Sequence, residues 1–222
     1  MADFFPNPET ADEHGLVAIT DTMSPELVLE AYCSGIFPWS TDPVRWYSPD
    51  PRAIFLRDTV HIPRRLVRDL RNVRFRVTFD AAFEAVMRGC AEAHRHSGEW
   101  ITETFIATYC ELHARGYAHS AEVWHDDTLV GGLYGVQVRG LFAGESMFHR
   151  VSNASKIAFA YTARHLYAIG VPLFDAQVLN DHTYSLGAVQ VRRRDYLALL
   201  RHVLRLRTPF DGKRWPTIVD PW

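Results

Sequence analysis

Residues 120–148 read SAEVWHDDTLVGGLYGVQVRGLFAGESMF, and this stretch indicates the fold of the chain more clearly than any other. Three segments rich in β-branched, aromatic and aliphatic residues are separated by the dipeptides Asp126-Asp127 and Arg139-Gly140, which favour tight turns. The pattern predicts a meander of three antiparallel strands. The third segment carries one acidic residue, Glu145, among small and apolar neighbours, and a lone carboxylate in such company needs a partner.

Helices and strands are expected on both sides of this meander. Residues 81–95 have a helical pattern, and a second helix is expected to begin after an N-cap at Thr102. A third helix follows the meander, with Ser152 as its N-cap and Gly170 as its stop. Residues 172–178 then form a strand, followed by a short helical piece, another strand and a further helical segment. The sequence therefore predicts a mixed α/β (α+β) protein.

The beginning of the chain has a different character. Residues 1–23 are turn-rich and extended, and a helix with proline at its first position is expected between an N-cap at Ser24 and a stop at Gly35. Several prolines and large aromatic residues then exclude a regular helix. We expect a small N-terminal domain over residues 1–57 and the main α/β domain over residues 58–222.

Composition is that of an ordinary globular protein. Of 222 residues, 47% are hydrophobic and 23% are charged, and the net charge of −2 does not by itself indicate a nucleic-acid-binding protein. We expect no membrane helix and no secretory signal, because no run approaches the roughly 18 apolar residues required and the N-terminus lacks a basic start. Three scattered cysteines fit reduced thiols, so we expect a cytoplasmic protein.

Positive charge is concentrated in two places. Residues 64–76 contain six arginines and one aspartate, and a second group of arginines lies within residues 192–207. Either group could bind a phosphate backbone, and either could be a solvated helix face. The histidines, including His94 and His96, have no metal-ligand spacing around them, so we expect no metal site.

Eight short strings occur in one order along nearly the whole chain. They are GIFPW (35–39), WYSPDPRA (46–53), WIT (100–102), GYAHSAEVW (116–124), LVGGLYGV (129–136), GESMF (144–148), NASK (153–156) and DAQVLNDHTYSLGA (175–188). Together they resemble the leucyl/phenylalanyl-tRNA–protein transferase family. The order of predicted elements also resembles the GNAT acyltransferase fold. The chain departs from the family pattern before its first helix, at Tyr47 and at Ala176.

The resemblance implies an aminoacyltransferase with a GNAT-like catalytic domain. Such an enzyme moves leucine or phenylalanine, with methionine as a further option, from aminoacyl-tRNA to the α-amino group of proteins that begin with arginine or lysine. The product is marked for degradation. The resemblance also implies a cytoplasmic enzyme that needs no cofactor and no metal, and we expect a monomer.

Three polar residues are the candidates for catalysis. Asp175 and Gln177 lie two apart on one predicted strand, so their side chains should face the same side, where the resemblance implies that they orient the amine and accept its proton. Asp175 could instead cap a loop, and Gln177 could satisfy a strand end. Glu145 could read the basic N-terminal residue of the acceptor and share in catalysis, or it could form a structural ion pair.

Further residues are candidates for binding the two ends of the donor. An apolar side chain and a terminal adenosine need an apolar pocket and aromatic surfaces. The pocket candidates, which could also be ordinary core, are Leu133, Met147 and Phe174. Trp39 and Trp100 are candidates for contacting the adenosine, and Tyr109 could contribute a hydroxyl or pack in the core. The candidates for binding tRNA phosphates are Arg64, Arg65, Arg68 and Arg71.

Two other functions remain open. A GNAT N-acyltransferase that uses a coenzyme A thioester would need a glycine-rich loop before the helix that follows the meander, and MFHRVSNASK (147–156) contains no glycine. A non-catalytic adaptor that binds tRNA or basic N-termini would not need the acidic and amide side chains named above.

Overall fold

The computed structural model describes residues 4–70, 74–95, 100–210, 212–217, 219 and 222. Within these residues a seven-stranded sheet forms the centre of the molecule, in the order β10-β4-β9-β8-β7-β6-β5. Its strands are β4 (Arg52–Phe55), β5 (Phe75–Phe79), β6 (Ala118–His125), β7 (Thr128–Val138), β8 (Leu141–His149), β9 (Leu173–Gln177) and β10 (Val189–Val191). Neighbouring strands are antiparallel except β8 and β9, which are parallel. The predicted meander is confirmed as β6, β7 and β8.

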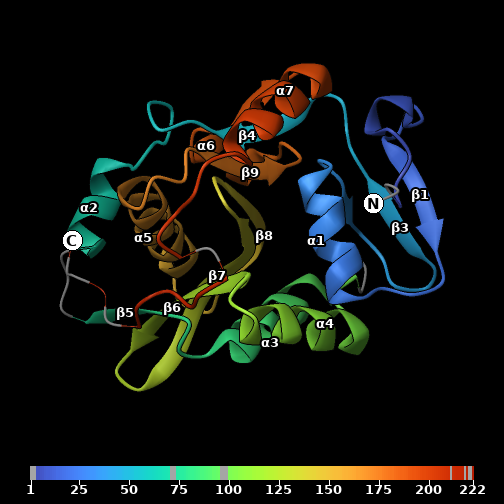
Figure 1. The fold of residues 1–222 in the computed structure, drawn as a ribbon. Coiled ribbons are helices and arrows are strands. Elements are labelled where there is room, and N and C mark those ends of the chain that lie inside the picture. Colours follow the sequence, from blue (N-terminus) through green and yellow to red (C-terminus); the bar gives the residue numbers. More distant parts are fainter. Residues whose placement is uncertain (1–3, 71–73, 96–99, 211, 218, 220–221) are drawn as a thin grey trace.

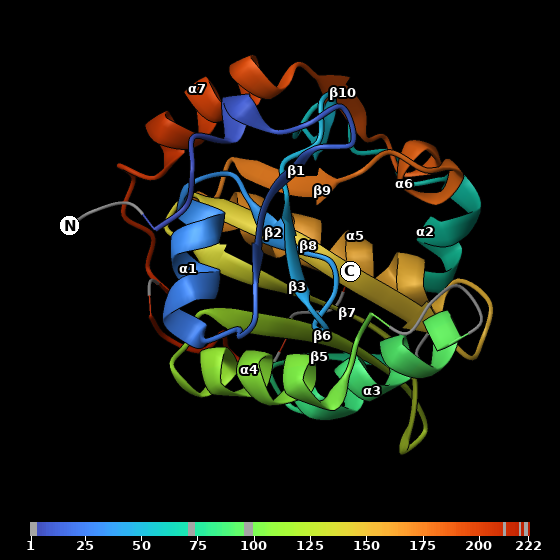
Figure 2. The same ribbon diagram turned by 90° about the vertical axis from the view of Figure 1, so that its right-hand side faces the viewer.

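Helices cover both faces of this sheet (Figures 1 and 2). On one face α3 (Phe83–His94) and α4 (Glu103–Ala114) pack against the meander, and on the other α5 (Ala154–Ala168) does so. The short helix α2 (Arg64–Leu70) packs on α5, and α6 (Asp181–Ser185) and α7 (Arg193–Val203) flank the last strand, β10. The mixed α/β class and the predicted order of helices and strands are therefore confirmed.

The N-terminal segment forms a second, smaller sheet. It contains β1 (Leu16–Thr20), β2 (Phe37–Pro38) and β3 (Val44–Tyr47) in the order β1-β3-β2, together with the 3-10 turn η1 (Pro8–Thr10) and α1 (Pro25–Cys33). The segment lies beside α4 and shares one hydrophobic core with α3, α4 and the meander. The chain enters the larger sheet already at β4, which lies within the expected N-terminal domain of residues 1–57.

Local signals explain where most helices begin and end. The hydroxyls of Ser24 and Thr102 accept hydrogen bonds from backbone N–H groups three residues later, at 3.2 and 3.3 Å, so both predicted N-caps are confirmed. Gly170, with φ of 81°, ends α5 as expected. The N-cap expected at Ser152 is wrong. Asn153 occupies that position with φ of 69° and, in place of capping, its side chain donates to Asp69 at 2.8 Å.

Within the described residues no helix has the length and apolar character needed to cross a bilayer.

Candidate active site

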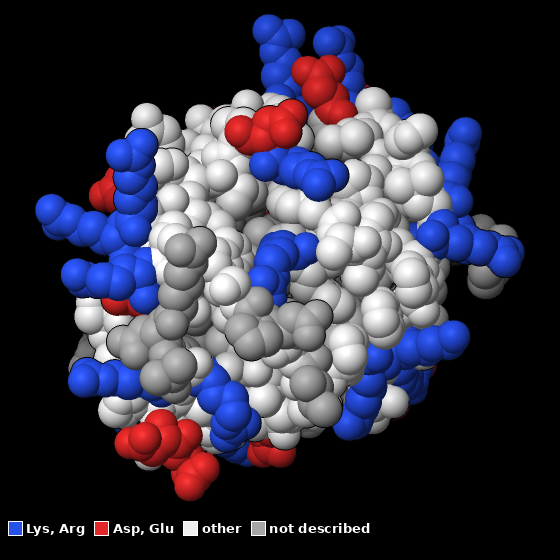
Figure 3. Space-filling view, turned by 90° about the vertical axis from the view of Figure 1, so that its left-hand side faces the viewer, with Lys and Arg blue, Asp and Glu red and all other residues white. Residues whose placement is uncertain are grey.

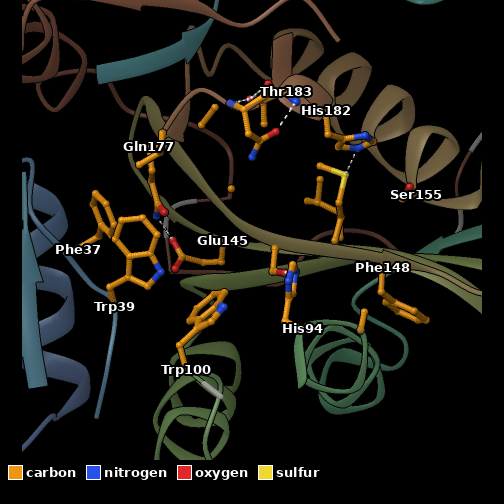
Figure 4. Close-up of a pocket in the computed structure, with 18 of the residues that line it drawn as sticks. Phe37, Trp39, His94, Trp100, Glu145, Phe148, Ser155, Gln177, His182 and Thr183 are labelled. Carbon is orange, nitrogen blue, oxygen red and sulfur yellow. Dashed lines mark hydrogen bonds between the residues drawn. The ribbon is translucent and has the colours of Figure 1, made fainter. Parts of the chain in front are cut away.

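A cavity of about 610 Å³ opens where β8 and β9 separate. The two strands pair only from Leu141–Leu173 to Ala143–Asp175, and β8 then continues to His149 paired with β7 alone. Gln177 ends β9 with φ of 63°, a left-handed conformation that turns its side chain into the gap. Its amide Nε2 donates to Glu145 Oε1 at 2.7 Å (Figure 4). The parting of two strands thus creates the cavity and brings these two polar groups together.

Glu145 sits in a chain of polar groups with no cation. Its second oxygen accepts from the Tyr109 hydroxyl at 3.4 Å, and Tyr109 shares a 2.7 Å hydrogen bond with Tyr32. Burial is the main cause that raises the pKa of Glu145 to about 8, and the charge of Asp175 adds to it, although hydrogen bonds from the tyrosines and Gln177 oppose the rise. No arginine or lysine in the described part of the chain forms an ion pair with Glu145, so its carboxyl group remains available to a ligand.

Asp175 has the opposite surroundings. It is fully buried and receives two hydrogen bonds from Arg52, with Nε–Oδ1 and Nη2–Oδ2 distances of 2.9 and 2.6 Å. The Tyr196 hydroxyl donates to it at 2.8 Å, and the backbone N–H of Gln177 donates at 2.8 Å. Asp175 therefore does not reach the cavity in this structure, although we expected it beside Gln177. It holds the backbone from which Gln177 projects.

The expected apolar residues line the other end of the cavity. Leu133 and Phe174 are buried in its wall, and Met147 is half-buried beside them. The Met147 sulfur lies 3.1 Å from Nε2 of His182, on α6, which closes this end. The cavity therefore joins a polar part at Glu145 to an apolar part at Met147.

Two tryptophans stand at the polar end. Trp39, 43% exposed, packs edge-on against Tyr47, and Trp100 packs edge-on against Phe105. Both line the cavity next to Glu145 (Figure 4). Tyr109, by contrast, is fully buried behind Glu145 and stacks on Phe105. It contacts the site through its hydroxyl and does not form part of the cavity wall.

Comparison with known proteins identifies the family. Residues 54–201 match the model of the leucyl/phenylalanyl-tRNA protein transferase, and residues 21–50 match that of its N-terminal domain.

This chain belongs to the leucyl/phenylalanyl-tRNA protein transferase family.

The relatives support this membership over almost their full length. The leucyl/phenylalanyl-tRNA–protein transferase of Shewanella baltica (strain OS185) is 48% identical over 218 residues, which cover 96% of this chain and 91% of the relative. That of Shewanella sp. (strain ANA-3) is 49% identical over 201 residues, 88% and 85% of the two chains. Among solved structures, a GCN5-related N-acetyltransferase from Kribbella flavida overlaps 74% of this chain and 60% of its own, with 10% identity and a TM-score of 0.40. Family membership makes this chain an aminoacyltransferase.

The structure of this transferase brings in residues that the sequence interpretation missed. Arg52 contacts Asp175, Tyr32 is linked to Glu145 through Tyr109, and His182 packs on Met147. His94 Nε2 lies 3.0 Å from the Ser146 hydroxyl inside the cavity. Arg52 and Ser146 both lie within the strings that carry the family resemblance. Arg52 directly follows a proline and Ser146 directly follows Glu145, so their positions in the sequence could have identified them as site residues.

The arginines expected to bind tRNA lie on α2, which begins near the end of α6. Arg64, Arg65 and Arg68 are exposed on α2, and Arg71 lies outside the described residues. The segment that leads into α2 is tied to the end of α6, because the His61 N–H donates to the Leu186 carbonyl at 2.9 Å. Figure 3 shows that lysine and arginine side chains outnumber acidic ones on the face that carries α2.

Among the described residues of the transferase, no group of three or more His, Cys, Asp or Glu side chains is arranged to hold a metal ion.

Proposed function

We propose that this enzyme transfers leucine or phenylalanine from aminoacyl-tRNA to the α-amino group of proteins that begin with arginine or lysine, which marks them for degradation. The single observation that carries the proposal is the cavity itself. It places a carboxyl group without a cation next to an apolar pocket, and the two substrates need these two features side by side.

The donor fits the apolar part of the cavity and its rim. The side chain of the amino acid would lie against Leu133, Met147 and Phe174, where an apolar surface replaces water around it. The terminal adenosine would stack on Trp39 and Trp100. The exposed arginines of α2 would contact phosphates of the tRNA without reading its sequence.

The acceptor fits the polar part. A cation beside Glu145 would stabilise its carboxylate form, so the site favours a substrate that brings positive charge with it. The α-ammonium group must lose a proton before it can attack, and Glu145, whose pKa burial raises to about 8, has the proton affinity to accept it once the substrate cation has stabilised the carboxylate form. The amide of Gln177 would hold the amine in place beside the donor ester.

The transfer needs no cofactor, because the donor ester is already activated. After Glu145 has taken one proton from the ammonium group, the amine nitrogen attacks the ester carbonyl carbon. The carbon–oxygen bond to the tRNA ribose then breaks, and the ribose oxygen leaves with the bond pair and the second proton from the nitrogen. Most of the rate would come from holding both substrates in attack geometry. The same proposal places the enzyme in the cytoplasm as a monomer.

A transfer assay tests this function. The enzyme is mixed with radiolabelled Phe-tRNA and a peptide that begins with arginine, and a matched peptide with an acetylated N-terminus is the control. We expect label only in the free-amine peptide. Glu145→Gln should lower transfer about 10- to 100-fold, because a charge-assisted hydrogen bond contributes roughly 1.5–3 kcal/mol.

Two outcomes would favour the rivals. Binding of Phe-tRNA and peptide without transfer of label would indicate an adaptor. Calorimetric binding of acetyl-CoA, with acetylation of the peptide, would indicate a coenzyme A-dependent acyltransferase.

A further inference from the structure

Ser146 and His94 form a polar pair that the mechanism above does not use. His94 Nε2 lies 3.0 Å from Ser146 Oγ, and both residues line the cavity. Figure 4 shows the His94 ring between Trp100 and Phe148, turned towards β8. The hydrogen bond with His94 therefore fixes the direction of the Ser146 hydroxyl inside the cavity.

Ser146 lies where the amine of the acceptor and the side chain and ribose of the donor would meet. The preceding residue on β8 is Glu145, beside which the amine would stand, and the following residue is Met147, in the wall of the apolar pocket. His94 itself is a neighbour of Trp100, with ring centroids 6.2 Å apart. The carbonyl carbon of the donor is bonded to the carbon that bears the side chain, to the ribose oxygen and, during transfer, to the amine. In this cavity, a carbon with these three attachments would lie close to Ser146.

The surroundings of the Ser146 hydroxyl leave its proton for the cavity. Burial raises the pKa of the Cys90 thiol, which lies one helical turn before His94 on α3, so Cys90 stays neutral and no thiolate competes for the Ser146 proton. Burial also lowers the pKa of His94, which is therefore neutral and carries one ring N–H. When that N–H is on Nε2, it donates to Ser146 Oγ, and the serine O–H is left to point into the cavity.

We propose that Ser146 is a further catalytic residue, whose hydroxyl donates a hydrogen bond to the donor's carbonyl oxygen as that oxygen becomes negative. His94 is the positioning residue that fixes this hydroxyl. The inference rests on the proposed function and adds a residue to it. As the amine nitrogen forms its bond to carbon, the carbonyl π pair moves onto oxygen, where Ser146 meets it without giving up its proton. The pair returns when the ribose oxygen leaves.

The test is a single-turnover transfer assay with the full-length enzyme, Phe-tRNA and a peptide beginning with arginine, both saturating. Ser146→Ala should slow transfer about 100-fold, the usual effect of removing one donor from an oxyanion site. The Kd for Phe-tRNA should stay within about twofold of wild type, because the hydrogen bond strengthens only in the transition state. Ser146→Thr keeps a hydroxyl and should retain most of the rate.

Ser120→Ala is the matched control. Ser120 is a buried serine on the meander strand β6, which β7 separates from β8, and its hydroxyl donates to Glu122 away from the cavity. Its loss should leave the transfer rate of the folded enzyme unchanged. Should Ser146→Ala fail to fold, Ser146→Cys has nearly the same shape with a weaker donor and should also be slow.

His94 variants separate positioning from structure. His94→Ala should slow transfer less than Ser146→Ala, and His94→Gln, which keeps a side-chain N–H, should recover part of the loss. The double variant Ser146→Ala/His94→Ala should be no slower than Ser146→Ala alone, because His94 acts through the serine.

Three results would overturn the role of Ser146. These are a wild-type rate in both Ser146→Ala and Ser146→Cys, a further loss from His94→Ala in the Ser146→Ala background, and an aminoacyl adduct on Ser146 in intact-protein mass spectra, which would make it a nucleophile. A wild-type enzyme that transfers no label contradicts the proposed function itself. The two failures are therefore distinct.

Discussion

Two carboxyl groups on neighbouring strands show how surroundings assign roles to single residues. Asp175 is buried against a guanidinium and a tyrosine hydroxyl, so its charge is already satisfied within the protein. Glu145 has only hydroxyl and amide partners, so it can exchange a proton or bind a substrate cation. Two acidic residues with such different partners are typical of enzyme active sites.

The proton affinity of Glu145 should be visible in stability. Because its pKa in the folded protein is about 8, the folded state keeps a proton that the unfolded chain loses above roughly pH 5. The free energy of unfolding therefore decreases as pH rises from about 5 to 8. Glu145→Gln removes this dependence, so urea denaturation should show the variant gaining stability relative to wild type across that range. A difference in unfolding free energy between Glu145→Gln and wild type that does not change with pH would contradict the raised pKa of Glu145.

Arg52 should be among the most sensitive residues for stability. It is 1% exposed, and besides Asp175 it donates to the Gly35 carbonyl and lies over the rings of Phe37 and Tyr196. Arg52→Met leaves a buried carboxylate without its partner, which typically costs about 3–5 kcal/mol.

Chemical denaturation measures this loss, and Arg88→Met is the control. Arg88 pairs with Glu84 and Glu103 on the surface, so its loss should cost no more than about 1 kcal/mol. Equal losses in the two variants would contradict the structural role of Arg52.

At the scale of elements, the position of α2 near the end of α6 decides how tRNA would approach. Its exposed arginines follow a segment that is hydrogen-bonded to the end of α6, and α6 closes the apolar end of the cavity. A tRNA held along α2 would therefore approach the cavity from its apolar end, on the side of α6.

Replacing the three arginines of α2 described above with alanine should weaken binding of Phe-tRNA and reduce its salt dependence. For each phosphate that no longer meets an arginine, the slope of log K against log salt should become shallower by roughly 0.7–0.9. The control variant makes the same change of charge on or beside α7, at the exposed residues Arg194, Arg201 and Arg205. Equal slopes in both variants, measured by filter binding, would remove α2 from the tRNA-binding surface.

Elements were predictable where short-range chemistry determines them. Ser24 and Thr102 cap helices through their own hydroxyls, and Gly170 ends one because its φ is positive. The cap expected at Ser152 failed because the asparagine beside it adopts a left-handed conformation. The burial of Asp175 could not be read from the sequence either, since its partner Arg52 is 123 residues away along the chain.

At the scale of the whole molecule, the N-terminal segment and the larger sheet form one packed body. Tyr32 and Trp46 are almost completely buried, and both belong to the core that α3, α4 and the meander share. Tyr32 also reaches the active site through Tyr109. The small sheet therefore supports the cavity as well as the fold.

Removal of residues 1–50 should consequently abolish cooperative folding. The shortened chain would expose the face of α4 and β7 on which α1 packs, and it would lose several buried aromatic side chains. Thermal unfolding followed by near-ultraviolet circular dichroism should show one transition for the full chain and none for the shortened one. A cooperative transition in the shortened chain would instead establish the larger part as an independent domain.

The separation of β8 from β9 has a consequence for which proteins can be modified. Beyond Ala143 the edge of β8 that faces β9 has no paired strand in the described part of the chain, so the first residues of an acceptor could pair with the free backbone groups of this edge. Those residues would have to be extended. A protein whose N-terminal residues are helical, or packed against its own surface, would not be a substrate even when it begins with arginine.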